Sequence, residues 1–272
     1  MAANFGGAAD YYEAIASIDE PLSVSCLFNA DSISALMDLV NIQNGTDTGG
    51  AWRLRVNGSG NILAATRSDD GGTTQTATTS TAASGATWYQ AGGVFASATD
   101  RRAFLNGAGK GTDANSVTTT GKIELDMAAF RFVATLFNGF SGKIAEVALW
   151  NVALSDAEMA ELGKFVCPLL INPGALVAYV PLVRATTDPK TGNALTAVGS
   201  PTVAAHAPVI YWRSRRLDSV PAATAAGGDG GLVWLRRRTR RFAHRRGLIM
   251  QAPGDLSVPV PTQPMNHNAP VV

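Results

Sequence analysis

Short stretches of apolar or alternating residues, separated by turn residues, run through the first 210 positions of the chain. Leu22–Phe28, Trp52–Val56 and Ile62–Arg67 have the patterns of buried or half-buried strands. Asn57–Asn61 and Asn106–Gly107 supply the Asn and Gly residues of tight hairpins. Further strand candidates are Tyr11–Ile15, Leu36–Ile42, Thr73–Thr79, Trp88–Phe95, Ala103–Leu105, Lys122–Leu125, Ala129–Ala134, Lys143–Trp150, Leu176–Leu182 and Val203–Ile210. This pattern predicts an all-β sandwich or barrel.

A single short helix is expected late in the strand-rich region. Ser155 is a favourable N-cap, and Glu158 follows three residues later, so the two residues form a capping box. Met159, Leu162 and Phe165 then recur at helical spacing, which gives the helix one apolar face. We therefore expect this helix to lie on an apolar surface of the sandwich.

Five segments of the chain follow one another in an order that is typical of one domain family. They are FGGAADYY from Phe5, WRLRVN from Trp52, WYQAGGVF from Trp88, RRAFLNG from Arg101 and FSGKIAEVALWNVALSDAE from Phe140. Together they resemble the motifs of laminin-G-like, concanavalin A-like jelly-roll domains, over residues 1–166. The resemblance implies an antiparallel two-sheet jelly-roll sandwich with one short helix, in which the first strands pair with the last.

The composition changes near Ser214, where we place the domain boundary. Residues 1–214 form the predicted sandwich, residues 215–231 a flexible linker, and residues 232–272 an extended arm rich in Arg and Pro. Residues 1–211 have 12 basic and 18 acidic side chains, whereas residues 212–272 have 10 arginines and 3 aspartates. An acidic body with a basic arm suggests that the arm meets an acidic partner.

The arm mixes arginines with apolar and aromatic residues. Its candidate contact residues are Trp234, Arg236, Arg237, Arg238, Arg240, Arg241, Phe242, Arg245 and Arg246. Arginine and aromatic side chains favour docking on other protein subunits. The arginines could instead neutralise phosphates of a nucleic acid, with the aromatic rings stacked on bases, and a solvated tail is a third interpretation. Because Leu232 and Ile249 at the two ends of this stretch favour burial, we expect a docking arm.

Two acidic residues match part of a catalytic motif of glycosidases with this fold. Glu124 and Asp126 correspond to the first two acids of a Glu-x-Asp-x-Glu strand, whose acids share one face. The third position is Ala128, or Ala129 in the variant with one more spacer, so the general acid is missing. Hydrolysis by two carboxylates needs both groups. We expect no enzyme, and two solvated acids on an ordinary strand.

No cofactor is expected, but one acidic loop is a candidate for calcium. Laminin-G-like domains often bind calcium on loops, and the paired carboxylates of Asp69 and Asp70 suit a hard cation. A plain polar turn is the alternative interpretation, because no fixed ligand spacing is present. Cys26 and Cys167 lie in apolar surroundings, so two buried free thiols are expected rather than a disulfide.

The chain shows neither the basic and apolar segments of a signal peptide nor a run of about 18 apolar residues that could span a membrane.

A single laminin-G-like domain followed by a Pro-rich arm resembles bacteriophage structural proteins. We expect a non-enzymatic virion protein (capsid decoration, head fibre or tail-associated), made in the host cytoplasm, homo-oligomeric and anchored on other virion subunits through its arm. The alternative is a lectin or adhesion module for host-surface glycans, since glycan binding is the commonest activity on this fold. A glycoside hydrolase is the second alternative.

Overall fold

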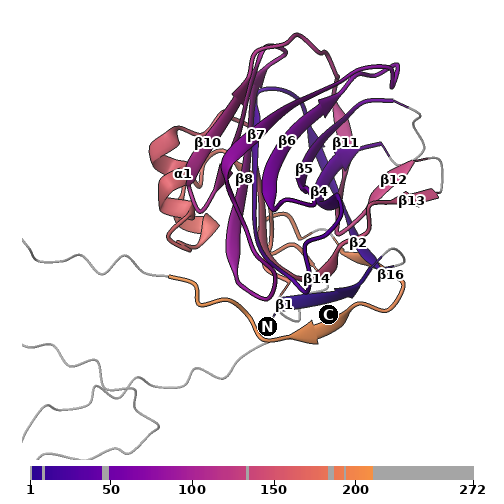
Figure 1. Cartoon of the computed structure of the whole chain (residues 1–272), viewed down its shortest axis with the longest axis vertical. Helices are drawn as coiled ribbons and strands as arrows, with labels where there is room; N and C mark the ends of the chain where they lie inside the picture. The colour runs from indigo at the N-terminus through magenta and orange to yellow at the C-terminus, as the bar shows by residue number, and fades with distance from the viewer. Residues whose placement is uncertain are drawn as a thin grey trace, which may run out of the picture. The chain divides into compact units, whose positions relative to one another are not determined.

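The computed structural model describes residues 2–7, 10–44, 49–132, 135–182, 187–192 and 194–210, which form a two-layer antiparallel β-sandwich (Figure 1). Sheet A contains β1 (Ala2–Gly6), β3 (Leu22–Ala30), β8 (Tyr89–Ser97), β9 (Asp100–Leu105), β10 (Ala108–Asp113), β14 (Ser141–Trp150), β15 (Leu176–Val180) and β17 (Thr202–Ala204). Sheet B contains β2 (Tyr11–Ile18), β4 (Met37–Gln43), β5 (Ala51–Val56), β6 (Asn61–Arg67), β7 (Thr74–Ala82), β11 (Lys122–Met127) and β16 (Thr196–Val198). A separate short hairpin consists of β12 (Phe130–Phe132) and β13 (Thr135–Phe137). The predicted jelly-roll sandwich is confirmed.

The first and last strands of the sandwich lie together, as the family resemblance implies. β1 pairs with β14 on one side and with β17 on the other, and β16 pairs with β2. The late strand predicted at Val203–Ile210 is wrong in extent, because β17 ends at Ala204. Ile210 instead exchanges backbone hydrogen bonds with Phe165 and Cys167, and so ties the end of the described chain to the segment after the helix.

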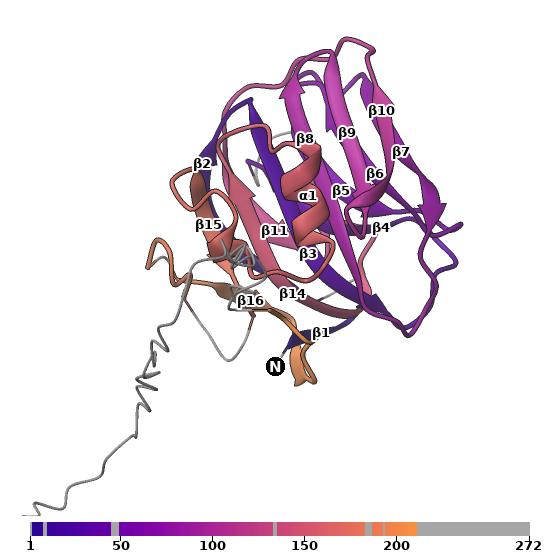
Figure 2. The same cartoon turned by 90° about the vertical axis from the view of Figure 1, so that its left-hand side faces the viewer.

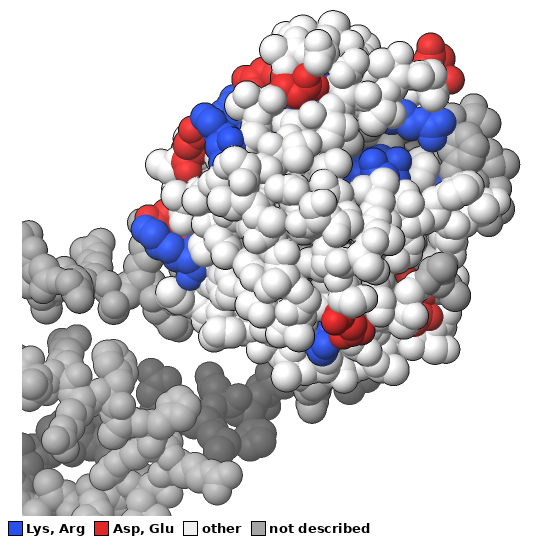
Figure 3. Space-filling view, viewed as in Figure 1, with Lys and Arg blue, Asp and Glu red and all other residues white. Residues whose placement is uncertain are grey.

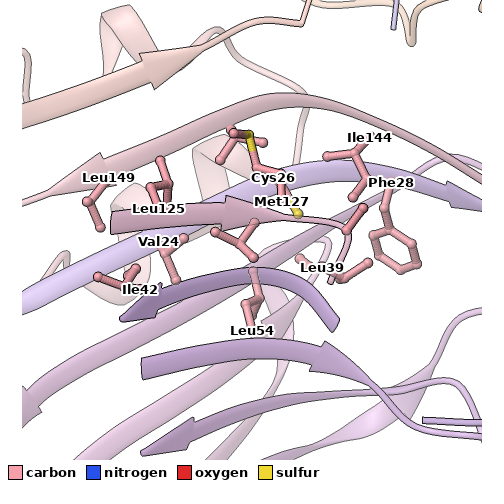
Figure 4. Close-up of a cluster of buried hydrophobic side chains, with 14 of the residues drawn as sticks. Val24, Cys26, Phe28, Leu39, Ile42, Leu54, Leu125, Met127, Ile144 and Leu149 are labelled. Atoms are coloured by element: carbon pink, nitrogen blue, oxygen red, sulfur yellow. The ribbon is translucent and has the colours of Figure 1, made fainter. Parts of the chain in front are cut away.

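Alternation along the strands directs one set of side chains into a continuous core between the sheets (Figure 4). Val24, Cys26 and Phe28 of β3 face this core, together with Leu39 and Leu54 of sheet B. All five side chains are fully buried. Burial of each large apolar side chain contributes about 1.5–3 kcal/mol to folding, so this layer alone supplies much of the stabilising free energy.

The two cysteines are buried free thiols, as predicted. Cys26 lies in the core between the sheets, and Cys167 lies in a second apolar cluster near the helix. Burial raises the pKa of both thiols, because an apolar environment disfavours the thiolate. Both sulfur atoms are therefore held in their unreactive protonated form.

The single helix, α1 (Asp156–Leu162), packs on the outer face of sheet A (Figure 2). Its capping box is formed as predicted: the Ser155 side chain accepts from the Glu158 N–H, and the Glu158 carboxylate accepts from the Ser155 N–H. Met159 and Leu162 are buried in an apolar cluster with side chains of sheet A. Phe165, expected on the same helical face, lies beyond the helix end and joins a third cluster. A short 3₁₀ turn, η1 (Pro168–Leu170), follows.

Among the described residues no helix covers the outer face of sheet B, and the β12–β13 hairpin lies against part of that face. None of the helices in the described part of the chain is long and apolar enough to cross a bilayer. The boundary predicted near residue 214, the linker at residues 215–231 and the arm at residues 232–272 all fall outside the described residues. Those three parts of the domain assignment stay predictions.

Candidate functional site

The outer face of sheet B carries a dense set of polar side chains. On β5, for example, Trp52 and Leu54 enter the core, so the intervening Arg53 and Arg55 point to the opposite face. The same alternation on the neighbouring strands completes a group that we call the polar face: Tyr11, Glu13, Asp38, Asn41, Gln43, Arg53, Arg55, Arg67, Glu124 and Asp126. Several of these side chains are nearly inaccessible to solvent, which is unusual for charged residues on an outer sheet face.

Asp38 organises the basic part of the polar face. Its two carboxylate oxygens accept hydrogen bonds from Arg53, at 3.1 Å from Nε and 2.6 Å from Nη2. The Nε of Arg55 lies 3.3 Å from the same carboxylate. Asn41 Oδ1 accepts a further hydrogen bond from Arg53 Nε. One buried carboxylate thus holds two guanidinium groups, which fixes their orientation.

The β12–β13 hairpin is attached to this basic region. The guanidinium carbon of Arg53 lies 3.8 Å from the ring centroid of Phe130, and that of Arg67 lies 5.9 Å from it. At the other end of the hairpin, the carbonyl of Asn138 accepts a hydrogen bond from the Asp38 N–H at 2.8 Å. Cation–π contacts and a backbone hydrogen bond therefore hold the hairpin over β4 and β5.

Arg131 organises the acidic part of the polar face. From β12 its guanidinium reaches the carboxylate of Glu13 at 3.2 Å, hydrogen-bonds to Glu124, and lies 3.7 Å from Asp126. The Arg131 guanidinium also lies 5.9 Å from the ring centroid of Tyr11. A single arginine on the hairpin thus faces three carboxylates on β2 and β11, and these ion pairs attach the hairpin at a second place besides the cation–π contacts of Phe130.

Asp126 is fully buried, so the expectation of two solvated acids is wrong. The hairpin and the neighbouring strands exclude water from Asp126, and Glu124 is ion-paired with Arg131 rather than solvated. Burial raises the pKa of the Asp126 carboxyl to about 7, although Arg131 and a hydrogen bond from Gln43 act in the opposite direction. Ala128, at the third motif position, is buried at a positive φ of 78°. A fully buried Asp126 cannot contact a substrate directly.

A pocket of about 290 Å³ opens between the hairpin and the basic part of the polar face. We call it the hairpin pocket, and its lining residues are Arg53, Arg67, Phe130, Phe137 and Asn138. Phe137 is 44% exposed, which is high for a large aromatic side chain, whereas Phe130 is 5% exposed and supports the floor. Figure 3 shows the charged residues of this face in small separate groups, surrounded by residues without a formal charge.

The predicted calcium candidates lie elsewhere, in the loop after β6. The Asp69 carboxylate accepts hydrogen bonds from Thr119, Thr120 and the Lys122 ammonium group, at 2.8–3.0 Å. Burial alone would raise the pKa of Asp69, but these donors lower it to about 2. Asp70 accepts hydrogen bonds within its own loop. Protein donors, including one cation, thus occupy the Asp69 oxygens that calcium would use, and this favours the plain polar turn.

Of the sequence-predicted site residues that the structure describes, Asp69 and Asp70 do not line the hairpin pocket. Trp234, Phe242 and the arginines of the predicted docking arm lie outside the described residues, so their role stays a prediction. The sequence reasoning did not identify the pocket. The only local signal for it is the Trp-Arg-Leu-Arg-Val alternation of β5, which places two arginines on one face of a strand whose other face is apolar.

Known proteins resemble the chain both in sequence pattern and in fold. The family model described as the concanavalin A-like lectin/glucanases superfamily matches residues 7–160, which is more than half of the chain. No curated protein matches the sequence. The matched range begins in the loop before β2 and ends within α1, so it includes β2 to β14 with the β12–β13 hairpin, but not β1, β15, β16 or β17.

Solved structures share the sandwich at low sequence identity. A Bacteroides ovatus protein, provisionally named for carbohydrate binding, aligns with a TM-score of 0.52 and 16% identity, over 77% of this chain and 61% of that chain. The CBM40 domain of the Ruminococcus gnavus IT-sialidase aligns with a TM-score of 0.49 and 16% identity, over 60% and 96%. A heptameric SAP-like pentraxin from Limulus polyphemus aligns with a TM-score of 0.49 and 11% identity, over 60% and 81%. At these identities the likeness concerns the fold alone.

Proposed function

Since the chain belongs to the concanavalin A-like lectin/glucanases superfamily, we propose that it is a carbohydrate-binding module whose ligand occupies the hairpin pocket. The observation that carries the proposal is the exposed ring of Phe137 beside the side chains of Arg53 and Asn138 in one concave site. A sugar ring has an apolar C–H face and a rim of hydroxyl groups. An aromatic surface flanked by fixed hydrogen-bond donors is complementary to both.

The two outer faces of the sandwich differ in a way that favours this location. α1 and the apolar cluster beneath it cover part of the outer face of sheet A. On the outer side of sheet B, ion pairs hold the arginines of the polar face, and the hairpin adds aromatic residues beside them. Groups that are held in place before binding lose little conformational entropy when a ligand arrives. The Bacteroides ovatus protein named provisionally for carbohydrate binding has the same fold, which agrees with this proposal.

A glycan array followed by calorimetry of the full chain tests the proposal. We expect at least one class of saccharide to bind, and Phe137→Ala to weaken that binding about threefold to tenfold through the lost aromatic contact. Leu170→Ala is the matched control, because Leu170 is a similarly exposed apolar residue beside α1, away from the hairpin pocket. If no saccharide binds, or if both variants weaken binding equally, the proposal is wrong.

The expected virion role concerns a different part of the chain and stays a prediction. It depends on residues 232–272 docking on capsid or tail subunits, or on nucleic acid, and on the chain forming a homo-oligomer. The motivating feature is the excess of arginine after residue 211. Proteomics of purified particles would test it, and a chain that never copurifies with particles would contradict it. A virion location would be compatible with glycan binding by the sandwich.

The absence of catalysis also stays a prediction. Glu124 is engaged by Arg131 and Asp126 is fully buried, and this arrangement supports a structural role for both acids. We expect no glycoside hydrolysis above background with the saccharides that bind. Glu124→Gln would abolish any hydrolysis that depends on the motif, so an activity that is lost in this variant would overturn the prediction.

A further inference from the structure

We infer that the carbohydrate bound in the hairpin pocket carries a carboxylate group, and that Arg53 and Arg67 bind this group. The inference rests on the proposed function and adds the chemical class of the ligand. It depends on the charges around the pocket, on the way in which the two guanidinium groups are held, and on the aromatic surfaces beside them. Each of these features belongs to described residues of β4, β5, β6 and the β12–β13 hairpin.

The first argument concerns charge. On the outer face of β4, β5 and β6, the polar face has three guanidinium groups, those of Arg53, Arg55 and Arg67, and one carboxylate, that of Asp38. Burial lowers the pKa of Arg67, and the nearby positive charge of Arg53 lowers it further. Two like charges in one small pocket repel each other. A bound anion between them would be attracted to both.

The second argument concerns geometry. Arg53 donates from Nε and Nη2 to Asp38, and a planar guanidinium has further N–H donors on its other edge. Arg67 donates from Nε and Nη2 to the carbonyl of Gly71, at 3.3 and 3.2 Å. Both groups therefore line the pocket in fixed orientations. Arginine held in this way suits the planar, two-oxygen geometry of a carboxylate, and such charge-assisted hydrogen bonds are among the stronger polar contacts in proteins.

The third argument concerns water. Phe130 lies under the Arg53 guanidinium, and Phe137 borders the same pocket. Apolar rings on two sides lower the local dielectric, which strengthens a contact between arginine and carboxylate relative to open water. A neutral sugar in the same position would remove water from two guanidinium groups and give no charged partner in return. The pocket should therefore select against neutral saccharides as well as in favour of acidic ones.

Calorimetry with the full chain tests this inference with matched probes. Trigalacturonic acid and N-acetylneuraminic acid supply the carboxylate from two different sugar classes, and their methyl esters keep the rings but remove the charge. We expect at least one free acid to bind, and its methyl ester to bind about tenfold or more weakly because hydrogen bonds to a charged group are lost. The acid that binds shows which class of acidic sugar, a uronic acid or a sialic acid, supplies the carboxylate. Binding of the acid should also weaken as salt rises from about 50 to 500 mM, because screening acts on the charged contact.

Two variants assign the effect to the pocket. Arg67→Gln should weaken binding of the acid about tenfold and leave the weak binding of its ester unchanged. Arg102→Gln is the control, because Arg102 is an arginine of β9 in the other sheet, paired with Asp100. It should bind the acid as the unmodified chain does. If Arg67→Gln does not fold, the salt dependence of the unmodified chain decides, and binding that is independent of salt would overturn the inference.

The possible failures are distinguishable. If neutral saccharides on the array bind and the free acids bind no better than their esters, the carbohydrate-binding role stands and the inference about the carboxylate is wrong. If neither acidic nor neutral saccharides bind, the proposed function itself is wrong and the inference falls with it. If the acid binds but Arg102→Gln weakens binding as much as Arg67→Gln does, the carboxylate is not bound in the hairpin pocket.

Discussion

The central carbon of the Arg53 guanidinium lies 3.8 Å from the ring centroid of Phe130. Arg53 belongs to β5 in the central part of sheet B, and Phe130 belongs to β12 in the short β12–β13 hairpin. Asp38 accepts hydrogen bonds from Nε and Nη2 along one edge of the same guanidinium. Sheet, arginine and hairpin therefore behave as one packed unit, and the hairpin pocket is shaped by that unit rather than by a loop alone.

Phe130→Ala should destabilise the protein, whereas Phe137→Ala should not. The buried Phe130 ring packs on Arg53, and its removal is expected to lower the free energy of unfolding by about 3 kcal/mol. Phe137 is 44% exposed, and its removal should change stability by less than about 1 kcal/mol. Urea unfolding of the two variants checks this. Equal losses of stability would contradict the assignment of Phe130 to the packed support of the hairpin and of Phe137 to its exposed surface.

Asp126→Asn should remove a pH dependence of stability. The pKa of Asp126 is about 7 in the folded protein and 3.8 for an ordinary aspartate, so the folded state favours the protonated form. Because the pKa is raised in the folded state, the protonated Asp126 contributes fully to the free energy of unfolding below pH 3.8. This contribution is lost as the pH rises through about 7. We expect the unmodified chain to lose up to about 4 kcal/mol over that interval relative to the Asp126→Asn variant.

Unfolding free energies of both proteins at a series of pH values between 4 and 8 provide the measurement. The difference between the two curves isolates Asp126 from other groups that titrate in the same range. Parallel curves would show that Asp126 ionises freely in the folded protein. In that case Asp126 is not buried beneath the hairpin in solution.

Asp69→Ala should lower stability by about 1–3 kcal/mol, because the buried Lys122 ammonium and two threonine hydroxyls lose their acceptor. The pKa of Asp69 is lowered to about 2 from 3.8, so the stability that it contributes is present above pH 3.8 and is lost as the pH falls toward 2. Thermal unfolding at pH 7 and pH 2.5 measures both effects. If Asp69→Ala destabilises the protein as much at pH 2.5 as at pH 7, the ion pair between Asp69 and Lys122 is contradicted.

Calcium should not change the melting temperature of the unmodified chain. The Lys122 ammonium group is already within 2.8 Å of the Asp69 carboxylate, in the position where a cation would be attracted. A bound ion would raise the melting temperature in proportion to its occupancy. Thermal unfolding in millimolar calcium and in EDTA makes the comparison. A rise with calcium that disappears in Asp69→Ala would restore the loop as a metal site.

Tyr179→Phe tests how the end of the sandwich is held. The Tyr179 hydroxyl donates to the buried Glu146 carboxylate at 2.6 Å, and His206 Nε2 lies 3.1 Å from the other carboxylate oxygen. Loss of the hydroxyl should destabilise the protein by about 1–3 kcal/mol, because a buried carboxylate loses a donor. Tyr89→Phe is the control, since the Tyr89 hydroxyl hydrogen-bonds to the backbone and side chain of the exposed Ser84. Equal effects of the two substitutions on urea unfolding would contradict the role of Glu146.

Much of the sandwich could be predicted from sequence because its signals are local. Alternation in β3 and β5, the Asn106–Gly107 turn and the Ser155 capping box each depend on residues within a few positions of one another. The Gly-containing strand β10 is not among the strands that the sequence pattern predicts. It is an edge strand that pairs only with β9, so its sequence needs little of the β propensity that reveals central strands.

The candidate site could not be predicted from the same signals. Arg53, Arg67 and Phe137 are far apart in sequence, and the pocket exists only because the hairpin folds back over the sheet. The burial of Asp126 has the same origin, since the strand pattern of β11 gave two acids on an outer face and an outer face is normally solvated. Tertiary contacts decide both features, and local propensity contains no information about them.

The most direct test of the account is an NMR titration of the full chain with the saccharide that binds most tightly on the array. We expect the largest chemical-shift changes at Phe137, Asn138, Arg53 and Arg67, with the signals of α1 unchanged. Changes centred on α1 or on the loop of Asp69, with the hairpin signals unmoved, would show that the hairpin pocket is not where this protein binds carbohydrate.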